Sequence, residues 1–181
     1  GTRYDLDGTG VPVSAALDLE YTFGSQNVGT PLIGVPRGGT DSIAVPNVFE
    51  WDDSLTARVG LEYRVGRYLT RAARVATDSA NLPDAGWAFR VGYVLDTRAT
   101  NPAYPTAFGT PPAATNVLTA GAGYRSGPFK ANLAYAYRFG SAEVSAGDLT
   151  APDRKKCSFC GDRGEYGMYL SGLYVDVGYQ F

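Results

Sequence analysis

The two cysteines of the 181-residue chain form the motif Cys157-Ser-Phe-Cys160, which is its most recognisable chemical feature. In a thioredoxin-like redox site this spacing occurs within a β-α-β unit, and no such pattern surrounds it here. A zinc site needs four ligands, and two cysteines without any histidine do not supply a usual set. We therefore expect a disulfide that braces an extracellular loop, where the environment is oxidising.

The absence of histidine removes Ser-His-Asp catalysis, the commonest general base and the commonest metal ligand. Trp51-Asp52-Asp53 pairs two carboxylates that suit a Ca²⁺ contact, but its position before a patterned segment favours a loop that begins a strand. We therefore expect no enzyme, no resident metal and no cofactor. With 16 Lys and Arg against 18 Asp and Glu, the net charge of −2 argues against a nucleic-acid partner.

A second group of chemically active side chains consists of ionisable residues that share one face of patterned segments. These candidates for lining an interior are Asp18, Glu20, Arg58, Glu62, Arg64, Arg90, Asp96, Arg138 and Asp176. They are interpreted either as cross-strand ion pairs that neutralise charge in an interior or as the polar lining of a solute path. In the second interpretation one of the arginines attracts a carboxylate, which a guanidinium binds bidentately.

These residues recur at every second position because they belong to six segments in which polar and apolar residues alternate. In one of them, for example, Val59 and Leu61 share a face while Gly60 and Glu62 share the other. Strict alternation is typical of β-strands with unlike faces. The predicted strands lie near residues 13–23, 51–65, 87–97, 117–125, 130–140 and 168–181, and residues 2–7 contribute the end of a seventh.

The contents of the two faces favour a membrane environment. The apolar face carries no charge, and the other face combines Gly and Ala with Arg rather than the Lys, Thr and Ser of a water-facing sheet. Aromatic residues gather at the strand ends of the apolar face, as in the interfacial girdles of outer-membrane barrels. The strands approach the roughly 9–11 residues of a tilted transmembrane strand. We therefore predict an all-β fold, an antiparallel transmembrane β-barrel in the outer membrane of a Gram-negative bacterium.

The connections alternate in length, as they do between the two ends of such a barrel. The turn at 126–128 is short, whereas the connections 24–50, 98–116 and 140–167 are long and rich in Gly, Pro, Thr and Asp. With the C-terminus at the periplasmic side, the long loops are extracellular. Residues 66–85 form a longer periplasmic connection whose arginines have helical spacing, which predicts a short surface helix.

The loop 98–116 is unusually apolar for an exposed segment, and exposed apolar patches often mark binding surfaces. Its Tyr104 and Phe108 are candidates for capturing a hydrophobic ligand. The alternative is a lid, stiffened by proline, that packs against its neighbours.

The C-terminal residues 173–181, with Tyr179 and Phe181, resemble the terminal-strand signal that the barrel-assembly machinery reads in outer-membrane proteins. A narrower resemblance, to the C-terminal half of FadL-type long-chain fatty-acid transporters, rests on five short motifs that keep that family's order. They are Trp51-Asp-Asp-Ser54, Arg58-Val-Gly-Leu-Glu-Tyr63, Phe89-Arg-Val-Gly-Tyr93, Leu118-Thr-Ala-Gly-Ala-Gly-Tyr124 and Leu133-Ala-Tyr-Ala-Tyr137. The resemblance implies a barrel of about 14 strands, through which a hydrophobic molecule diffuses passively after capture by extracellular loops. The family's N-terminal hatch has no counterpart in these residues.

Six or seven strands are too few for a bacterial barrel, which has at least eight, and an open edge in lipid costs several kcal/mol for each unpaired backbone group. We therefore expect the remaining strands to come from the same longer chain or from another chain. The other expected partners are outer-membrane lipid and lipopolysaccharide, the barrel-assembly machinery and a hydrophobic small molecule. Two further functions stay open: a structural or partner-binding barrel without transport, and a general polar porin.

Overall fold

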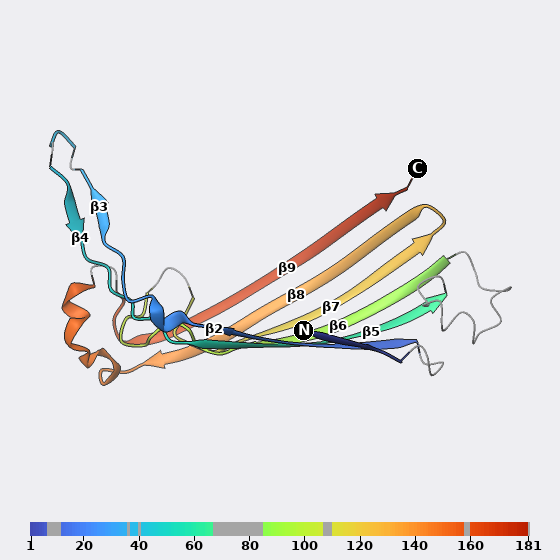
Figure 1. The fold of residues 1–181 in the computed structure, drawn as a ribbon, viewed down its shortest axis with the longest axis horizontal. Coiled ribbons are helices and arrows are strands. Elements are labelled where there is room, and N and C mark those ends of the chain that lie inside the picture. The colour runs from blue at the N-terminus through green and yellow to red at the C-terminus, as the bar shows by residue number, and fades with distance from the viewer. Residues whose placement is uncertain are drawn as a thin grey trace.

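The computed structural model describes residues 1–6, 12–35, 37–39, 41–66, 85–106, 110–157 and 160–180. These residues form one seven-stranded antiparallel sheet in the order β1-β2-β5-β6-β7-β8-β9 (Figure 1). Its strands are β1 (Thr2–Asp5), β2 (Val13–Thr22), β5 (Ser54–Gly66), β6 (Ala85–Asp96), β7 (Thr115–Ser126), β8 (Phe129–Val144) and β9 (Gly164–Tyr179). The predicted all-β, antiparallel architecture is thereby confirmed.

The strands pair in chain order because each connection returns the chain beside the strand that it has just left. The tightest return joins β7 to β8, where Gly127 adopts a φ of 52°, a left-handed conformation that glycine reaches at little cost. Its neighbour Pro128 follows in the turn. The resulting register keeps most large apolar side chains on one face and most ionisable ones on the other, and a slip by one residue would turn every side chain over.

Two long strands extend past their predicted ends. β8 continues to Val144 and β9 begins at Gly164, so the connection expected over 140–167 shortens to 145–163. The long connection after β2 contains a separate hairpin of β3 (Leu32–Gly34) and β4 (Ile43–Val45). The helix expected between β5 and β6 falls on residues 67–84, outside the described residues.

Short 3₁₀ segments lie in the loops: η2 (Gly24–Gln26), η4 (Asp148–Thr150) and η5 (Pro152–Lys156). Among the residues described above, no helix has the length and apolar character needed to cross a membrane. The long connections after β2, β6 and β8 gather at one end of the sheet, and the β7–β8 turn and the C-terminal end of β9 lie at the other (Figure 1). We refer to these as the loop end and the turn end.

The sheet has no conventional hydrophobic core. The buried apolar side chains of the described part include Ala88, Tyr104, Pro105, Ala113 and Val144, whereas the apolar face remains open to solvent, as at Leu19 with 62% exposure. The sheet is also not closed, because β1 and β9 are its two edges within the described ranges. The seven strands therefore form a curved wall with two unlike faces, one apolar and one charged.

Candidate functional site

The charged face gathers the nine predicted ionisable residues because the register places their strands side by side with matching orientation. Asp18 lies opposite Arg58, and Glu62 lies opposite Arg90. Directly opposed residues of an antiparallel pair have Cβ atoms about 5 Å apart, so their side chains interact. The result is a set of separate ion-pair clusters.

The largest of them, here the Glu62 cluster, consists of Arg3, Asp5, Glu62, Arg64 and Arg90. The carboxylate of Glu62, 17% exposed, lies 2.8 Å from Arg64 Nε, 2.5 Å from Arg90 Nε and 3.2 Å from Arg3 Nη2. Arg64 Nη2 and Arg3 Nε also donate to Asp5, at 2.7 and 3.1 Å. Three guanidinium groups thus surround two carboxylates, which leaves one formal positive charge.

The second group, the Arg58 cluster, has the opposite balance. Arg58 donates from Nη1 to Asp18 at 2.6 Å and from Nη2 to Glu20 at 2.7 Å. One guanidinium therefore faces two carboxylates, so these three side chains sum to one formal negative charge, and the Gly1 amino group lies 3.2 Å from Asp18 Oδ1. Its position on β2 and β5 is closer to the loop end than that of the Glu62 cluster.

The last predicted members of the charged face lie further along the sheet. Arg138 on β8 forms an ion pair with Asp96 on β6, and its Nε donates to the hydroxyl of Thr115 at 3.1 Å. Asp176 on β9 accepts from Asn132 at 2.8 Å and lies 3.4 Å from Lys130 Nζ. Each of the nine predicted residues therefore has an oppositely charged or hydrogen-bonding partner across a strand.

An open groove of about 630 Å³ lies on this face over β1, β2, β5 and β6. Its charged lining consists of Arg3, Asp18, Arg58, Glu62 and Arg90, and its floor includes Gly60 and Gly92. A Cβ at position 92 would lie 2.7 Å from the Thr119 hydroxyl, so glycine gives the floor its depth at that point. The groove is large enough to hold part of a small organic molecule.

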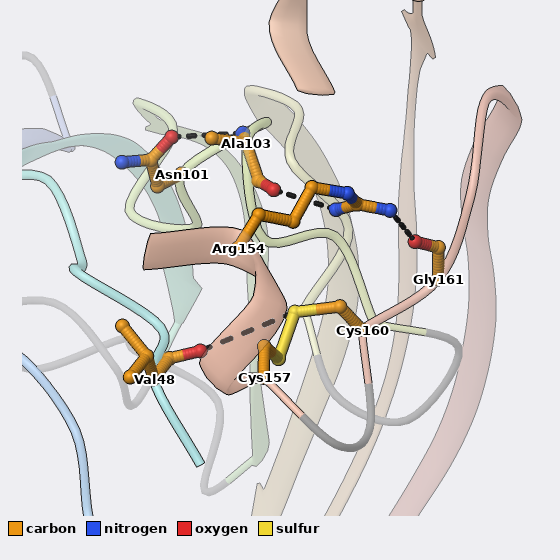
Figure 2. Close-up of a disulfide and its surroundings, with 7 residues drawn as sticks. All are labelled: Val48, Asn101, Ala103, Arg154, Cys157, Cys160 and Gly161. Atoms are coloured by element: carbon orange, nitrogen blue, oxygen red, sulfur yellow. Dashed lines mark hydrogen bonds between the residues drawn. A yellow bond between two sulfur atoms is a disulfide. The ribbon is translucent and has the colours of Figure 1, made fainter. Parts of the chain in front are cut away.

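At the loop end, three connections distant in sequence meet around a disulfide between Cys157 and Cys160 (Figure 2). Arg154, in η5 of the same connection, donates to the carbonyl of Ala103 at 2.7 Å and to that of Gly161 at 2.5 Å. In addition, Cys160 Sγ lies 4.0 Å from the Val48 carbonyl oxygen. Arg154 therefore joins the connection after β6 to the one after β8, beside the disulfide.

A cavity of about 360 Å³ opens at this junction. Its lining is mostly apolar and comprises Leu32, Asn47, Val48, Phe49, Trp51, Tyr104, Thr106, Cys157 and Cys160. The predicted capture residue Tyr104 is only 2% exposed, and the Phe49 and Trp51 rings lie 5.0 Å apart. The second predicted capture residue, Phe108, lies outside the described residues. The sequence did not point to Leu32 or Phe49, because their place in the cavity depends on how three loops meet.

The adjacent carboxylates Asp52 and Asp53 serve different partners. Asp52 lies 2.9 Å from Arg98 Nη2. Asp53 accepts from the Ser25 backbone N–H at 2.9 Å and from the Tyr21 hydroxyl at 2.8 Å. Hydrogen bonds from Ser25, first its hydroxyl and then its N–H, lower the pKa of Asp53, and the Tyr21 hydroxyl adds to the effect. Within the ranges described, no group of three or more His, Cys, Asp or Glu residues could hold a metal ion.

The predicted assembly signal is described in part. Tyr179 ends β9 with its side chain exposed, and Phe181 falls outside the described residues.

Comparison of the chain with protein-family models, with curated proteins and with solved structures finds no match in any of the three.

Proposed function

We propose that this chain forms part of the wall of an outer-membrane β-barrel, of FadL-like type, through which hydrophobic molecules such as long-chain fatty acids diffuse passively. The observation that carries the proposal is the contrast between the two faces of one sheet. Over the middle of the seven strands one face is apolar and carries no charged residue, and ion pairs occupy the opposite face; Glu143 and Glu165 join the apolar side only at the loop end of β8 and β9. This arrangement suits lipid on one side and a polar interior on the other.

The exposed apolar surface favours this environment over water. Soluble monomers seldom expose a contiguous apolar patch larger than a few hundred Å². Here large apolar side chains are exposed on every strand from β2 to β9 of the main sheet. Lipid contact would make their burial favourable, and further strands, from the same longer chain or another one, would satisfy the edges of β1 and β9.

The apolar cavity at the loop end supports the choice of cargo. It lies among the long connections, where a molecule arriving from outside would first meet the protein. Its aromatic and aliphatic lining suits a hydrophobic molecule better than a hydrated ion. In this scheme Tyr104 and its neighbours capture the molecule, lipid and lipopolysaccharide surround the wall, and the barrel-assembly machinery reads Tyr179 and Phe181.

The test uses the full polypeptide that carries this sequence, reconstituted into liposomes. The proposal expects protein-dependent transfer of a fluorescent long-chain fatty acid into the vesicles, with little ion conductance in planar bilayers. High conductance without fatty-acid transfer would instead indicate a polar porin. Absence of both would indicate a structural or partner-binding barrel.

Two adjacent residues of β3 provide a matched pair of variants. Leu32 lines the cavity, whereas Ile33 is 70% exposed and takes no part in the lining. We expect Leu32→Arg to slow transfer by placing a charge in the apolar cavity, while Ile33→Arg leaves transfer unchanged. Equal effects of the two variants would contradict capture at this cavity.

A further inference from the structure

Arg90 differs from the other arginines of the charged face in how much of its guanidinium is engaged. Arg58 uses both Nη1 and Nη2 for carboxylates, and Arg138 uses Nε and Nη2 for Asp96 and Thr115. Arg90 contacts Glu62 through Nε alone. Within the described part of the chain, its Nη1 and Nη2 make no hydrogen bond. Arg90 therefore keeps the end of its guanidinium available, with two N–H groups that can point at one acceptor.

Among the described residues, Glu62 is the carboxylate that contacts Arg90, and Asp18, held by Arg58, is the other carboxylate that lines the groove. Glu62 lies opposite Arg90 on β5, and its carboxylate is shared among three arginines. On the other side, Gly121 of β7 lies opposite Arg90. Gly121 in turn pairs with Ala134 on β8, so the two neighbouring strands present only small residues in this row, and Tyr174 on β9 follows. The one formal positive charge of the Glu62 cluster is therefore not cancelled from β7 or β8.

The open end of Arg90 also belongs to a groove. Arg90 is 40% exposed and lines the groove together with Gly92, Val94 and Thr119. From Arg90 toward the loop end, the β6 wall of the groove therefore changes from a cation to glycine and then to valine. At about 3.3 Å for each strand residue, the distance from Arg90 to Val94 is roughly 13 Å, which accommodates a short alkyl chain.

From this placement we propose that the groove binds the head group of an amphiphile, and that the head group is an oxyanion held by Nη1 and Nη2 of Arg90. Carboxylate and phosphate share the required chemistry, since both offer two oxygens to one guanidinium. The apolar part of the molecule extends along Gly92 and Val94 toward the loop end. The inference rests on the proposed passage of hydrophobic molecules and adds a residue that distinguishes charged from uncharged ones.

The experiment measures binding of three probes with the same alkyl chain, dodecanoate, dodecyl phosphate and dodecanol, by equilibrium dialysis. The protein is the full chain in lipid nanodiscs, and empty nanodiscs give the lipid background. Loss of a charged hydrogen bond corresponds to a change of about 10- to 100-fold in affinity. We therefore expect Arg90→Gln to weaken dodecanoate by that factor and to leave dodecanol unchanged. Dodecyl phosphate tells the two head groups apart: weakening of both anions means a general oxyanion site, and weakening of dodecanoate alone means a carboxylate site.

Two further variants separate head-group binding from a general structural effect. Arg90→Lys keeps the positive charge but loses the bidentate geometry of the guanidinium, so its dodecanoate affinity should lie between those of the wild type and Arg90→Gln. Arg98→Gln removes an arginine that follows the same strand but pairs with Asp52 outside the groove, and it should change neither probe. Arg90→Gln leaves Glu62 with Arg3 and Arg64, and a urea titration of each variant verifies that it folds.

The outcomes distinguish the inference from the proposed function. If the wild type binds dodecanoate and dodecanol and Arg90→Gln weakens both equally or neither, the head-group site is overturned and the passage of hydrophobic molecules stands. If the wild type binds none of the probes, both proposals are overturned. Loss of dodecanoate affinity in Arg98→Gln equal to that in Arg90→Gln would also overturn the assignment to Arg90.

Discussion

Arginine placed at two valines of β6 tests which face of the sheet contacts lipid. Val91 lies near the middle of the strand on the apolar face and is 56% exposed, whereas Val94 lies on the charged face and lines the groove. The same substitution in the same strand therefore places a guanidinium on either side. Val94 is directly opposite Arg58, whose carboxylate partners Asp18 and Glu20 offset the charge that a second arginine would bring.

The expected loss in the free energy of unfolding is several-fold larger for Val91→Arg than for Val94→Arg. An arginine at the midplane of a lipid-facing strand costs about 2–4 kcal/mol, which lowers the folding equilibrium constant roughly 30- to 700-fold. In water an exposed position of this kind would change stability by no more than about 0.5 kcal/mol. For Val94→Arg on the charged face we expect a cost below about 1 kcal/mol, because the Asp18 and Glu20 carboxylates lie beside the added cation.

The assay is reversible unfolding by urea of the full chain in phosphatidylcholine vesicles, followed by tryptophan fluorescence. Trp87 lies on the apolar face of the same strand and reports its transfer from water to lipid. If the apolar face contacts lipid, Val91→Arg lowers the free energy of unfolding by at least about 2 kcal/mol, while Val94→Arg stays within about 1 kcal/mol of the wild type. A Val91→Arg protein as stable as the wild type, or equal losses in both variants, would refute a lipid-facing apolar surface.

Three other perturbations follow from individual contacts and use the same urea titration. Glu62→Gln removes the carboxylate between three arginines and should lower the free energy of unfolding by about 3 kcal/mol. Hydrogen bonds from Ser25 lower the pKa of Asp53 in the folded state. The stability that these bonds contribute is therefore fully present above the unfolded carboxyl pKa of about 3.9, and it is lost as pH falls through the lower pKa of the folded state. Asp53→Asn should therefore flatten the acid limb of unfolding midpoints measured between about pH 2 and 5. Reduction of Cys157–Cys160 should add two hydrogens to the intact mass and lower stability by about 2 kcal/mol, with faster proteolysis of that loop.

Each of these has a result that would count against it. Glu20→Gln changes a 54% exposed partner of Arg58 and should cost less than about 1 kcal/mol, so a loss as large as that of Glu62→Gln would remove the special role of the Glu62 cluster. An acid limb that Asp53→Asn leaves unchanged would assign the pH dependence to other carboxylates. A mass that reductant does not alter would mean that the cysteines are not paired with each other.

Strand positions could be predicted from the sequence where the two faces differ in chemistry. In β5, Arg58, Gly60 and Glu62 alternate with Val59 and Leu61, so the contrast alone defines strand and face. The ends of β8 and β9 lack that contrast. Ser141 pairs with Gly167, and Glu143 with Glu165, so backbone hydrogen bonds extend the ladder where side-chain polarity gives no signal.

The partners of the charged residues could not be predicted, because they depend on register. Arg3 and Asp5 belong to a four-residue strand that is too short for a periodic signal, yet they complete the Glu62 cluster. The contacts at the junction of the loops could not be predicted either, because they join residues that are far apart in the sequence. Arg154 and Ala103 are 51 residues apart in sequence, and only the paths of two loops bring them together.

The charge on the charged face also has an order along the strands that a count of charged residues would miss. Toward the loop end, Asp18, Glu20 and Asp96 face Arg58 and Arg138, which leaves one negative charge. Further from that end, the Glu62 cluster leaves one positive charge. An anion on this face therefore meets more carboxylates than arginines near the loops and more arginines than carboxylates at Arg90. Two unit charges about 4 Å apart interact by about 1 kcal/mol in water and by more in a less polar medium. Burial of an apolar chain contributes about 25 cal/mol per Å², so an alkyl chain can offset the unfavourable electrostatic free energy of its anionic head group near the carboxylates. The arrangement therefore favours amphiphiles over small free anions.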